Sequence, residues 1–237
     1  MNAEASRDVA TRKILDAVEI ETGPGPACAV IWLHGLGADG HDFESIVPEL
    51  RLPAEPVRFV FPHAPMQPVT INAGMVMRAW YDVRDAEIRR EDEAGIRGSQ
   101  ELLEALIRRE KERGVKAERL VLAGFSQGGA IALQTGLRHS ERLAGIMALS
   151  CYLPLAEALP AEAADENRGT PIFMAHGLAD PIVPVARARQ SRDFLEQLGY
   201  SVQWHEYPMP HSVCIEEIAD VGAWLRQVIP PSRGSSA

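Results

Sequence analysis

Short, mostly apolar runs alternate with longer segments of helical spacing along most of this chain. Each run is four or five residues long and apolar on both alternating phases, as expected for strands buried on both faces of a parallel sheet. Five such strands are predicted, at 29–33, 57–61, 120–123, 146–149 and 172–175. Residues 200–207 begin with strict alternation of apolar and polar positions, which is typical of a half-covered outer strand.

The segments between these runs predict helices. One helix carries Ile96, Leu103 and Leu106 on one face and should end at Gly114, and others are predicted at 127–139, at 185–198 and from 215 onward. Strands that alternate with helices predict an α/β fold, with a mostly parallel central sheet and helices on both faces. We expect a single domain over residues 1–229 and a disordered tail at 230–237.

The stretch at 64–92 interrupts this alternation. It contains prolines, methionines and a charged run at its end. Structureless segments of this length are uncommon in compact domains, and covering a binding site is one usual reason for them. We therefore expect this stretch to cover a site, while the charged run by itself indicates a solvated face.

Charge and composition restrict the partners and the compartment. The chain of 237 residues has a net charge of −9, which argues against binding to nucleic acid or to an anionic membrane surface. No segment resembles a secretory signal or a membrane span, so we expect no membrane insertion. The three cysteines form no CxxC pair, which favours a reducing, cytoplasmic location. A homodimer remains open.

One serine lies between glycines directly after a predicted buried strand. The segment Gly124-Phe-Ser-Gln-Gly128 matches G-x-S-x-G, the nucleophile elbow, in which the serine occupies a strained strand-to-helix corner. The positions two before and two after the serine crowd each other, so glycine is needed at both. A glycine-rich turn is the simpler alternative. The strand before the motif and the small-residue helix after it favour Ser126 as a nucleophile.

A serine hydroxyl needs a base, and the base needs an orienting carboxylate. In this motif order the acid and then the histidine follow the serine. His211 lies in a proline-braced loop after the last predicted strand, and Asp180 lies in the loop after the strand at 172–175. These two residues are the predicted base and acid, although an Asx turn before Pro181 is the alternative for Asp180. His139 is predicted to lie on the surface.

The loop after the first predicted strand is rich in glycine and is suited to an oxyanion hole. The backbone N–H groups of Leu36 and Gln127 are predicted to converge on the developing oxyanion. His34 is interpreted as a structural residue that holds this loop. A metal site of His34, His41 and His63 is not supported by ligand spacing, so no metal is expected.

With these residues together, the chain resembles the phospholipase/carboxylesterase family of small α/β-hydrolases, which includes carboxylesterases and acyl-protein thioesterases. The matching stretches are LHGLGADGHDF at 33–43, FPHAP at 61–65, MRAWYD at 77–82, GFSQGGA at 124–130, LSCYLP at 149–154, HGLADPIVP at 176–184 and PHS at 210–212. Residues 65–82 are most similar in character to the bacterial carboxylesterases. The resemblance implies an α/β-hydrolase fold without a large cap domain, a triad of Ser126, Asp180 and His211, and no cofactor.

The predicted function is a serine carboxylesterase that hydrolyses short- to medium-chain, small-molecule esters through an acyl-enzyme. An acyl-protein thioesterase or a lysophospholipase with the same triad is the alternative, and a catalytically inactive receptor or scaffold is disfavoured because the triad is complete. Cys151 is a weaker nucleophile candidate, since no histidine motif is aimed at it. Met75 and Trp80 are predicted to line a shallow acyl groove, unless they only pack over the sheet edge.

Overall fold

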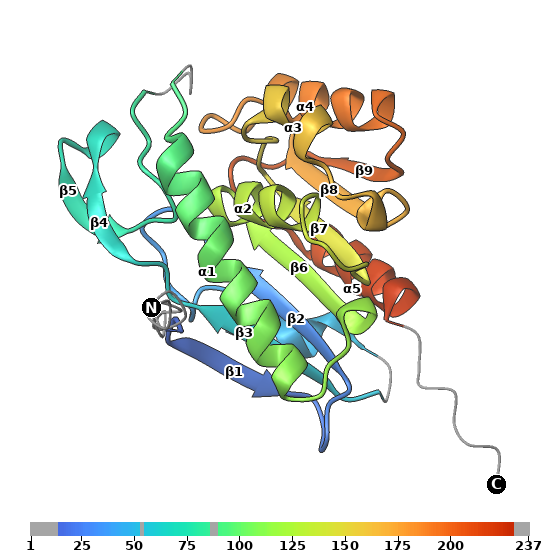
Figure 1. The fold of residues 1–237 in the computed structure, drawn as a ribbon. Helices are drawn as coiled ribbons and strands as arrows, with labels where there is room; N and C mark the ends of the chain where they lie inside the picture. The colour runs from blue at the N-terminus through green and yellow to red at the C-terminus, as the bar shows by residue number, and fades with distance from the viewer. Residues whose placement is uncertain (1–13, 53–54, 86–89, 230–237) are drawn as a thin grey trace, which may run out of the picture.

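The molecule is built around a central β-sheet that is flanked by helices (Figure 1). The computed structural model describes residues 14–52, 55–85 and 90–229, so the predicted tail at 230–237 lies outside the described residues. Within them, seven strands form one sheet in the order β1-β3-β2-β6-β7-β8-β9. Their bounds are β1 Ala17–Glu21, β2 Cys28–Leu33, β3 Val57–Pro62, β6 Leu120–Phe125, β7 Gly145–Leu149, β8 Ile172–Gly177 and β9 Val202–Tyr207.

All six predicted strands are present, and they pair parallel with one another. The sequence prediction missed β1, which pairs antiparallel with β3 at the edge of the sheet. This strand has the sequence Ala-Val-Glu-Ile-Glu. Its two carboxylates form ion pairs with arginines: Glu21 lies 2.9 Å from Arg58, and Glu19 lies 2.9 Å from Arg113. A short edge strand with charges lacks the continuous apolar run that identified the others.

Helices cover both faces of the sheet, and β2 shows how the sequence assigns them. Ile31 and Leu33 pack in one core, with α1, α2 and α4, whereas Val30 and Trp32 pack in the other, with η1 and α5. Successive side chains of a strand point to opposite faces, so a continuously apolar strand supplies both cores. The helices are α1 Glu93–Glu112, α2 Gln127–Gly136, α3 Leu159–Glu162, α4 Val185–Gln197, α5 Ile215–Val228 and the 3₁₀ helix η1 Glu44–Leu50.

The helix ends follow their sequence signals in all but one case. Gly114, with φ 95°, follows α1, and Gly199, with φ 86°, follows α4. The helix α2 ends at Gly136, three residues before the predicted end, and the prediction that His139 lies on the surface is wrong. The ring Nδ1 of His139 lies 2.9 Å from a carboxylate oxygen of Glu104 on α1. The helix α2 is buried along its whole length, and His139 is buried with it.

The stretch at 64–92 contains a hairpin that the sequence prediction missed. The strands β4, Met66–Val69, and β5, Met75–Arg78, pair antiparallel and stand beside the main sheet (Figure 1). The turn between them uses two residues with positive φ, Ala73 at 56° and Gly74 at 75°. Pro68 lies inside β4, and a proline within an apolar run ordinarily argues against a strand. In the part of the chain that is described, no helix combines the length and the apolarity that crossing a membrane requires.

Candidate active site

Ser126 occupies a strained corner between β6 and α2. Its φ of 56° and ψ of −121° lie outside the regions that side-chain-bearing residues normally adopt. A methyl group at Gly124 would overlap the backbone of Gly128, and a methyl group at Gly128 would overlap the carbonyl of Leu33. The two glycines therefore allow β2, β6 and α2 to approach closely enough to hold this corner.

Ser126, His211 and Asp180 form one continuous chain of hydrogen bonds. The His211 Nε2 atom lies 3.0 Å from the Ser126 hydroxyl oxygen, and His211 Nδ1 lies 2.6 Å from an Asp180 carboxylate oxygen. An ionised carboxylate only accepts, so Nδ1 carries the proton and Nε2 is left to accept the serine proton. The other Asp180 oxygen accepts from the backbone N–H groups of Ile182 at 2.8 Å and Val183 at 2.9 Å, which orients the carboxylate.

A second histidine holds the acid loop. His176, at the end of β8, is fully buried, and its Nε2–H donates to the Val183 carbonyl at 2.7 Å. The same nitrogen lies 3.2 Å from the Asp180 carboxylate. Burial lowers the pKa of His176, so the ring is neutral and serves as a fixed donor. A hydrogen bond from a buried side chain thus fixes the loop that directs Asp180 toward His211.

The loop after β2 presents the predicted oxyanion donors. Among the described residues, the backbone N–H groups of Leu36 and Gln127 donate to no other backbone group. His34 braces this loop: its Nδ1–H donates to the Gly35 carbonyl at 2.7 Å, and its Nε2 accepts from the Ala64 N–H at 3.0 Å. Burial lowers the pKa of His34, which is therefore neutral and already bonded at both nitrogens. It has no free atom with which to act as a base.

Trp80 supports the loop after β2 instead of lining a groove. Its indole N–H donates to the His34 carbonyl at 2.9 Å, and the side chain is 1 % exposed. The Gln127 side chain accepts from the Trp80 N–H at 3.1 Å and donates to the Tyr81 carbonyl at 2.9 Å. Met75 lies on the outside of the hairpin and is 64 % exposed. Neither Met75 nor Trp80 is among the residues that line the cavity beside Ser126.

That cavity has a volume of about 520 Å³, and Ser126, His211 and both predicted oxyanion residues line it. Most of its remaining wall is apolar and includes Ile71, Val83, Phe125, Ile182 and Pro184. Ile71 and Val83 come from the stretch predicted to cover a site, so part of that stretch does border the cavity. The sequence prediction named neither, because a segment without regular period gives no signal of which side chains face inward.

These features can be compared with known proteins. The family model for phospholipase/carboxylesterase proteins matches residues 16–229. The chain belongs to this family. It is 43 % identical over 213 residues to acyl-protein thioesterase 1 of Gibberella zeae, an alignment that covers 85 % of this chain and 91 % of that protein.

Solved structures agree with this assignment. Acyl-protein thioesterase 2 of Zea mays matches with a TM-score of 0.79 and 28 % identity, covering 90 % of this chain and 100 % of that one. A Bacillus cereus carboxylesterase matches with a TM-score of 0.72 at 18 % identity, over 90 % of this chain and 94 % of that one, which shows the shared fold alone. The predicted family and α/β-hydrolase fold are confirmed, and the protein is a hydrolase of the ester and thioester class.

The other residues that the sequence raised, Cys151 as a nucleophile and three histidines as metal ligands, are not arranged for those roles. Burial raises the pKa of the Cys151 thiol, so it stays protonated and unreactive. Of the three histidines weighed as metal ligands, His34 is bonded at both ring nitrogens, and His63 Nδ1 accepts the Gly40 N–H at 3.0 Å. His41 Nδ1 lies 3.2 Å from a Glu44 carboxylate oxygen. Within the described residues, no group of three or more histidine, cysteine or acidic side chains is arranged to hold a metal ion.

Proposed function

We propose that the protein hydrolyses acyl thioesters through an acyl-enzyme on Ser126. The observation that carries this proposal is the unbroken chain from the Ser126 hydroxyl through His211 to Asp180. His211 Nε2 takes the hydroxyl proton as Ser126 Oγ attacks the carbonyl carbon, and the N–H groups of Leu36 and Gln127 receive the oxyanion. The thiol then leaves with the proton from His211, and a water molecule activated in the same way releases the acid.

Two considerations favour thioesters as the first substrate class. The relative that is 43 % identical over 85 % of this chain is named an acyl-protein thioesterase. In chemical terms, a thiolate, whose thiol has a pKa of about 8.5, is a better leaving group than an alkoxide. A thioester therefore needs less proton donation from His211 than an oxoester does. The apolar wall of the cavity suits the acyl chain in either case.

A carboxylesterase that acts on short- to medium-chain, small-molecule esters is the second candidate. It is supported by the size of the cavity, about 520 Å³, and by its position directly beside Ser126. The triad performs the same steps on an oxoester, with an alcohol as the leaving group. The lysophospholipase alternative shares the triad, and no separate feature of the described residues favours it.

The location and the assembly are further parts of the proposal. Cys28, Cys151 and Cys214 are free thiols in the structure, which supports a reducing, cytoplasmic compartment. A small-molecule substrate needs no protein partner, and a homodimer stays a prediction from the sequence.

A matched pair of substrates tests the substrate class. The same octanoyl group is placed on the cysteine of a short peptide as a thioester and on the serine of an otherwise identical peptide as an oxoester. We expect kcat/KM to be at least about tenfold higher for the thioester, and Ser126→Ala to lose both activities. Faster cleavage of the oxoester would identify a carboxylesterase, and hydrolysis that persists in Ser126→Ala would refute the proposed nucleophile.

A further inference from the structure

Two tyrosines that line the cavity beside Ser126 bring their hydroxyl groups together. The oxygens of Tyr81 and Tyr152 lie 3.1 Å apart, and both residues line the cavity together with Ser126. Tyr81 follows the hairpin and Tyr152 follows β7, so the pair joins segments 71 positions apart in the chain. Both side chains are almost fully buried, with 3 % and 4 % of their surface exposed.

A count of donors leaves one O–H without a partner. Each neutral phenol carries a single proton, and burial raises the pKa of both groups so that both stay protonated. The hydrogen bond between the two oxygens uses one of the two protons. Among the described residues, neither oxygen has a second hydrogen-bond partner. One phenol donor at the wall of the cavity is therefore free to bind an acceptor on a ligand.

The surroundings hold the pair in place. The Tyr81 carbonyl accepts the Gln127 side-chain amide at 2.9 Å, which anchors Tyr81 beside the nucleophile. The guanidinium of Arg187 lies 4.4 Å from the centre of the Tyr152 ring. Apolar residues such as Val83 and Pro184 line the same cavity. A purely alkyl chain in this cavity would leave the free donor desolvated and unpaired, which is unfavourable.

We propose that Tyr81 and Tyr152 select substrates with an acceptor oxygen, such as a hydroxyl, ether or carbonyl group, at a fixed separation from the scissile carbonyl. This selection rests on the proposed hydrolysis at Ser126 and specifies which substrates it favours. The group that the tyrosines recognise is an acceptor oxygen, which either the acyl chain or the leaving group of the substrate can carry. One recovered hydrogen bond changes kcat/KM by about tenfold.

Positional isomers of one substrate test this selection. The first series is octanoyl thioesters with a hydroxyl at C3, C5 or C7, and the second series places a hydroxyl at successive carbons of the leaving group. Wild-type protein should prefer one isomer of one series over the unsubstituted octanoyl thioester by about tenfold, because a fixed donor reaches one position. The series that contains this isomer identifies the side of the substrate that carries the acceptor.

The double variant Tyr81→Phe/Tyr152→Phe is decisive. Either single change leaves one phenol whose O–H is still available, whereas the double change removes both donors at nearly constant volume. The preferred isomer should then fall to the level of the unsubstituted thioester. Tyr200→Phe is the matched control: Tyr200 is also buried and its hydroxyl has no partner among the described residues, but it does not line this cavity, so the preference should remain.

Binding separates this inference from the proposed function. The affinity of Ser126→Ala for the intact isomers, measured by calorimetry, should show the same roughly tenfold preference. If wild-type protein hydrolyses no thioester or ester while this binding preference is found, the proposed function is wrong and the selection stands. If the plain thioester is hydrolysed but no isomer in either series is preferred, or the double variant keeps the preference, the selection is refuted.

Discussion

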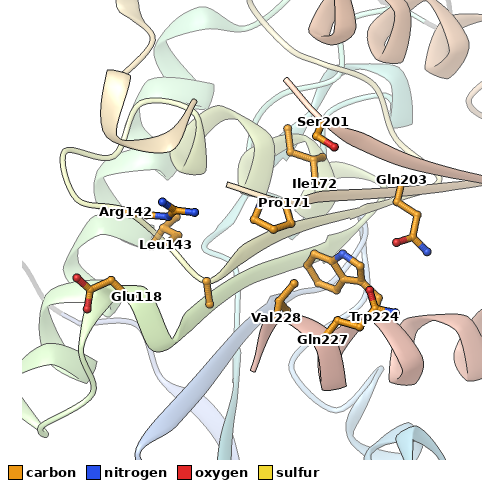
Figure 2. Close-up of a pocket in the computed structure, with 11 residues that line it drawn as sticks. Glu118, Arg142, Leu143, Pro171, Ile172, Ser201, Gln203, Trp224, Gln227 and Val228 are labelled. Carbon is orange, nitrogen blue, oxygen red and sulfur yellow. The ribbon is translucent and has the colours of Figure 1, made fainter. Parts of the chain in front are cut away.

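Two cavities of similar size lie at opposite ends of the parallel strands, and they differ in chemistry. The cavity beside Ser126 lies at the carboxyl ends of the parallel strands and measures about 520 Å³. The second measures about 440 Å³ and lies at their amino ends, where Arg142 and Glu118 stand on one side and Gln203 and Trp224 on the other (Figure 2). Its polar side chains do not converge on one point. Volume alone therefore does not single out a candidate active site, whereas the hydrogen-bonded chain of Ser126, His211 and Asp180 does.

The difference follows from the direction of the strands. Parallel strands bring the loops that follow them to one edge, so the loops after β2, β6, β8 and β9 meet there. Ser126, Asp180 and His211 each lie in one of these loops, and Leu36 lies in another. At the amino ends, within the described residues, no side-chain hydrogen bond joins two of the residues that line the second cavity. The experiments below compare the two edges, from the largest expected effect to the smallest.

The largest effect should come from the nucleophile. Ser126→Ala should lower kcat for the octanoyl thioester by about 10⁴-fold or more, because the acyl-enzyme can no longer form. Ser201→Ala, a serine that lines the cavity at the amino edge, should leave kcat unchanged. Steady-state kinetics and labelling by a fluorophosphonate probe measure both variants. A label that persists in Ser126→Ala would place the chemistry elsewhere.

Asp180→Asn should be nearly as severe, with a loss of about 10³- to 10⁴-fold in kcat. The asparagine can still accept the N–H groups of Ile182 and Val183 through its oxygen, which turns its NH₂ toward His211. That contact favours the tautomer with the proton on Nε2, which cannot accept the serine proton. Asp165→Asn, in an exposed turn before β8, is the control and should retain full activity. Equal losses in both variants would contradict the assigned acid.

The next effect concerns stability at the catalytic end of α5. Glu217 is completely buried in the first turn of this helix, and burial raises its pKa from 4.5 to about 8. Between these values the folded state holds a proton that the unfolded state releases, so stability falls as pH rises through this window and the loss is complete above about pH 8. The full change corresponds to about 5 kcal/mol.

Urea unfolding at pH 5, 6.5 and 8 measures this effect. The wild-type free energy of unfolding should fall across the series relative to that of Glu217→Gln, which carries no titratable carboxyl at this position. Parallel pH profiles for the two proteins would show that Glu217 does not titrate in this range.

The smallest effect concerns the wall of the catalytic cavity. Ile71 lines the cavity, whereas Met75 on the same hairpin does not. Ile71→Ala should lower kcat/KM for octanoyl substrates by about fivefold, since each buried methylene contributes about 0.8 kcal/mol, and should leave acetyl substrates unaffected. Met75→Ala should leave the chain-length profile unchanged. The opposite outcome would restore the groove that the sequence suggested for Met75.

The sequence predicted those features that neighbouring residues determine among themselves. The buried strands can be predicted from their apolar runs. The elbow at Ser126 depends on the lack of side chains two positions away on either side, at Gly124 and Gly128. The order of serine, acid and histidine along the chain then selected Asp180 and His211. Each of these inferences uses local sterics or strand direction, which do not require knowledge of distant contacts.

Features that depend on contacts between distant segments were decided by the tertiary structure. Trp80 was predicted to line a groove, but its indole N–H is directed by the carbonyl of His34, 46 positions earlier. The pairing of the Tyr81 and Tyr152 hydroxyls likewise requires the hairpin to lie against the loop after β7. His139 is buried because α1 packs over the turn that contains it. In irregular segments no period assigns a side chain to a face, so its direction comes from whichever distant group packs against it or completes its hydrogen bond.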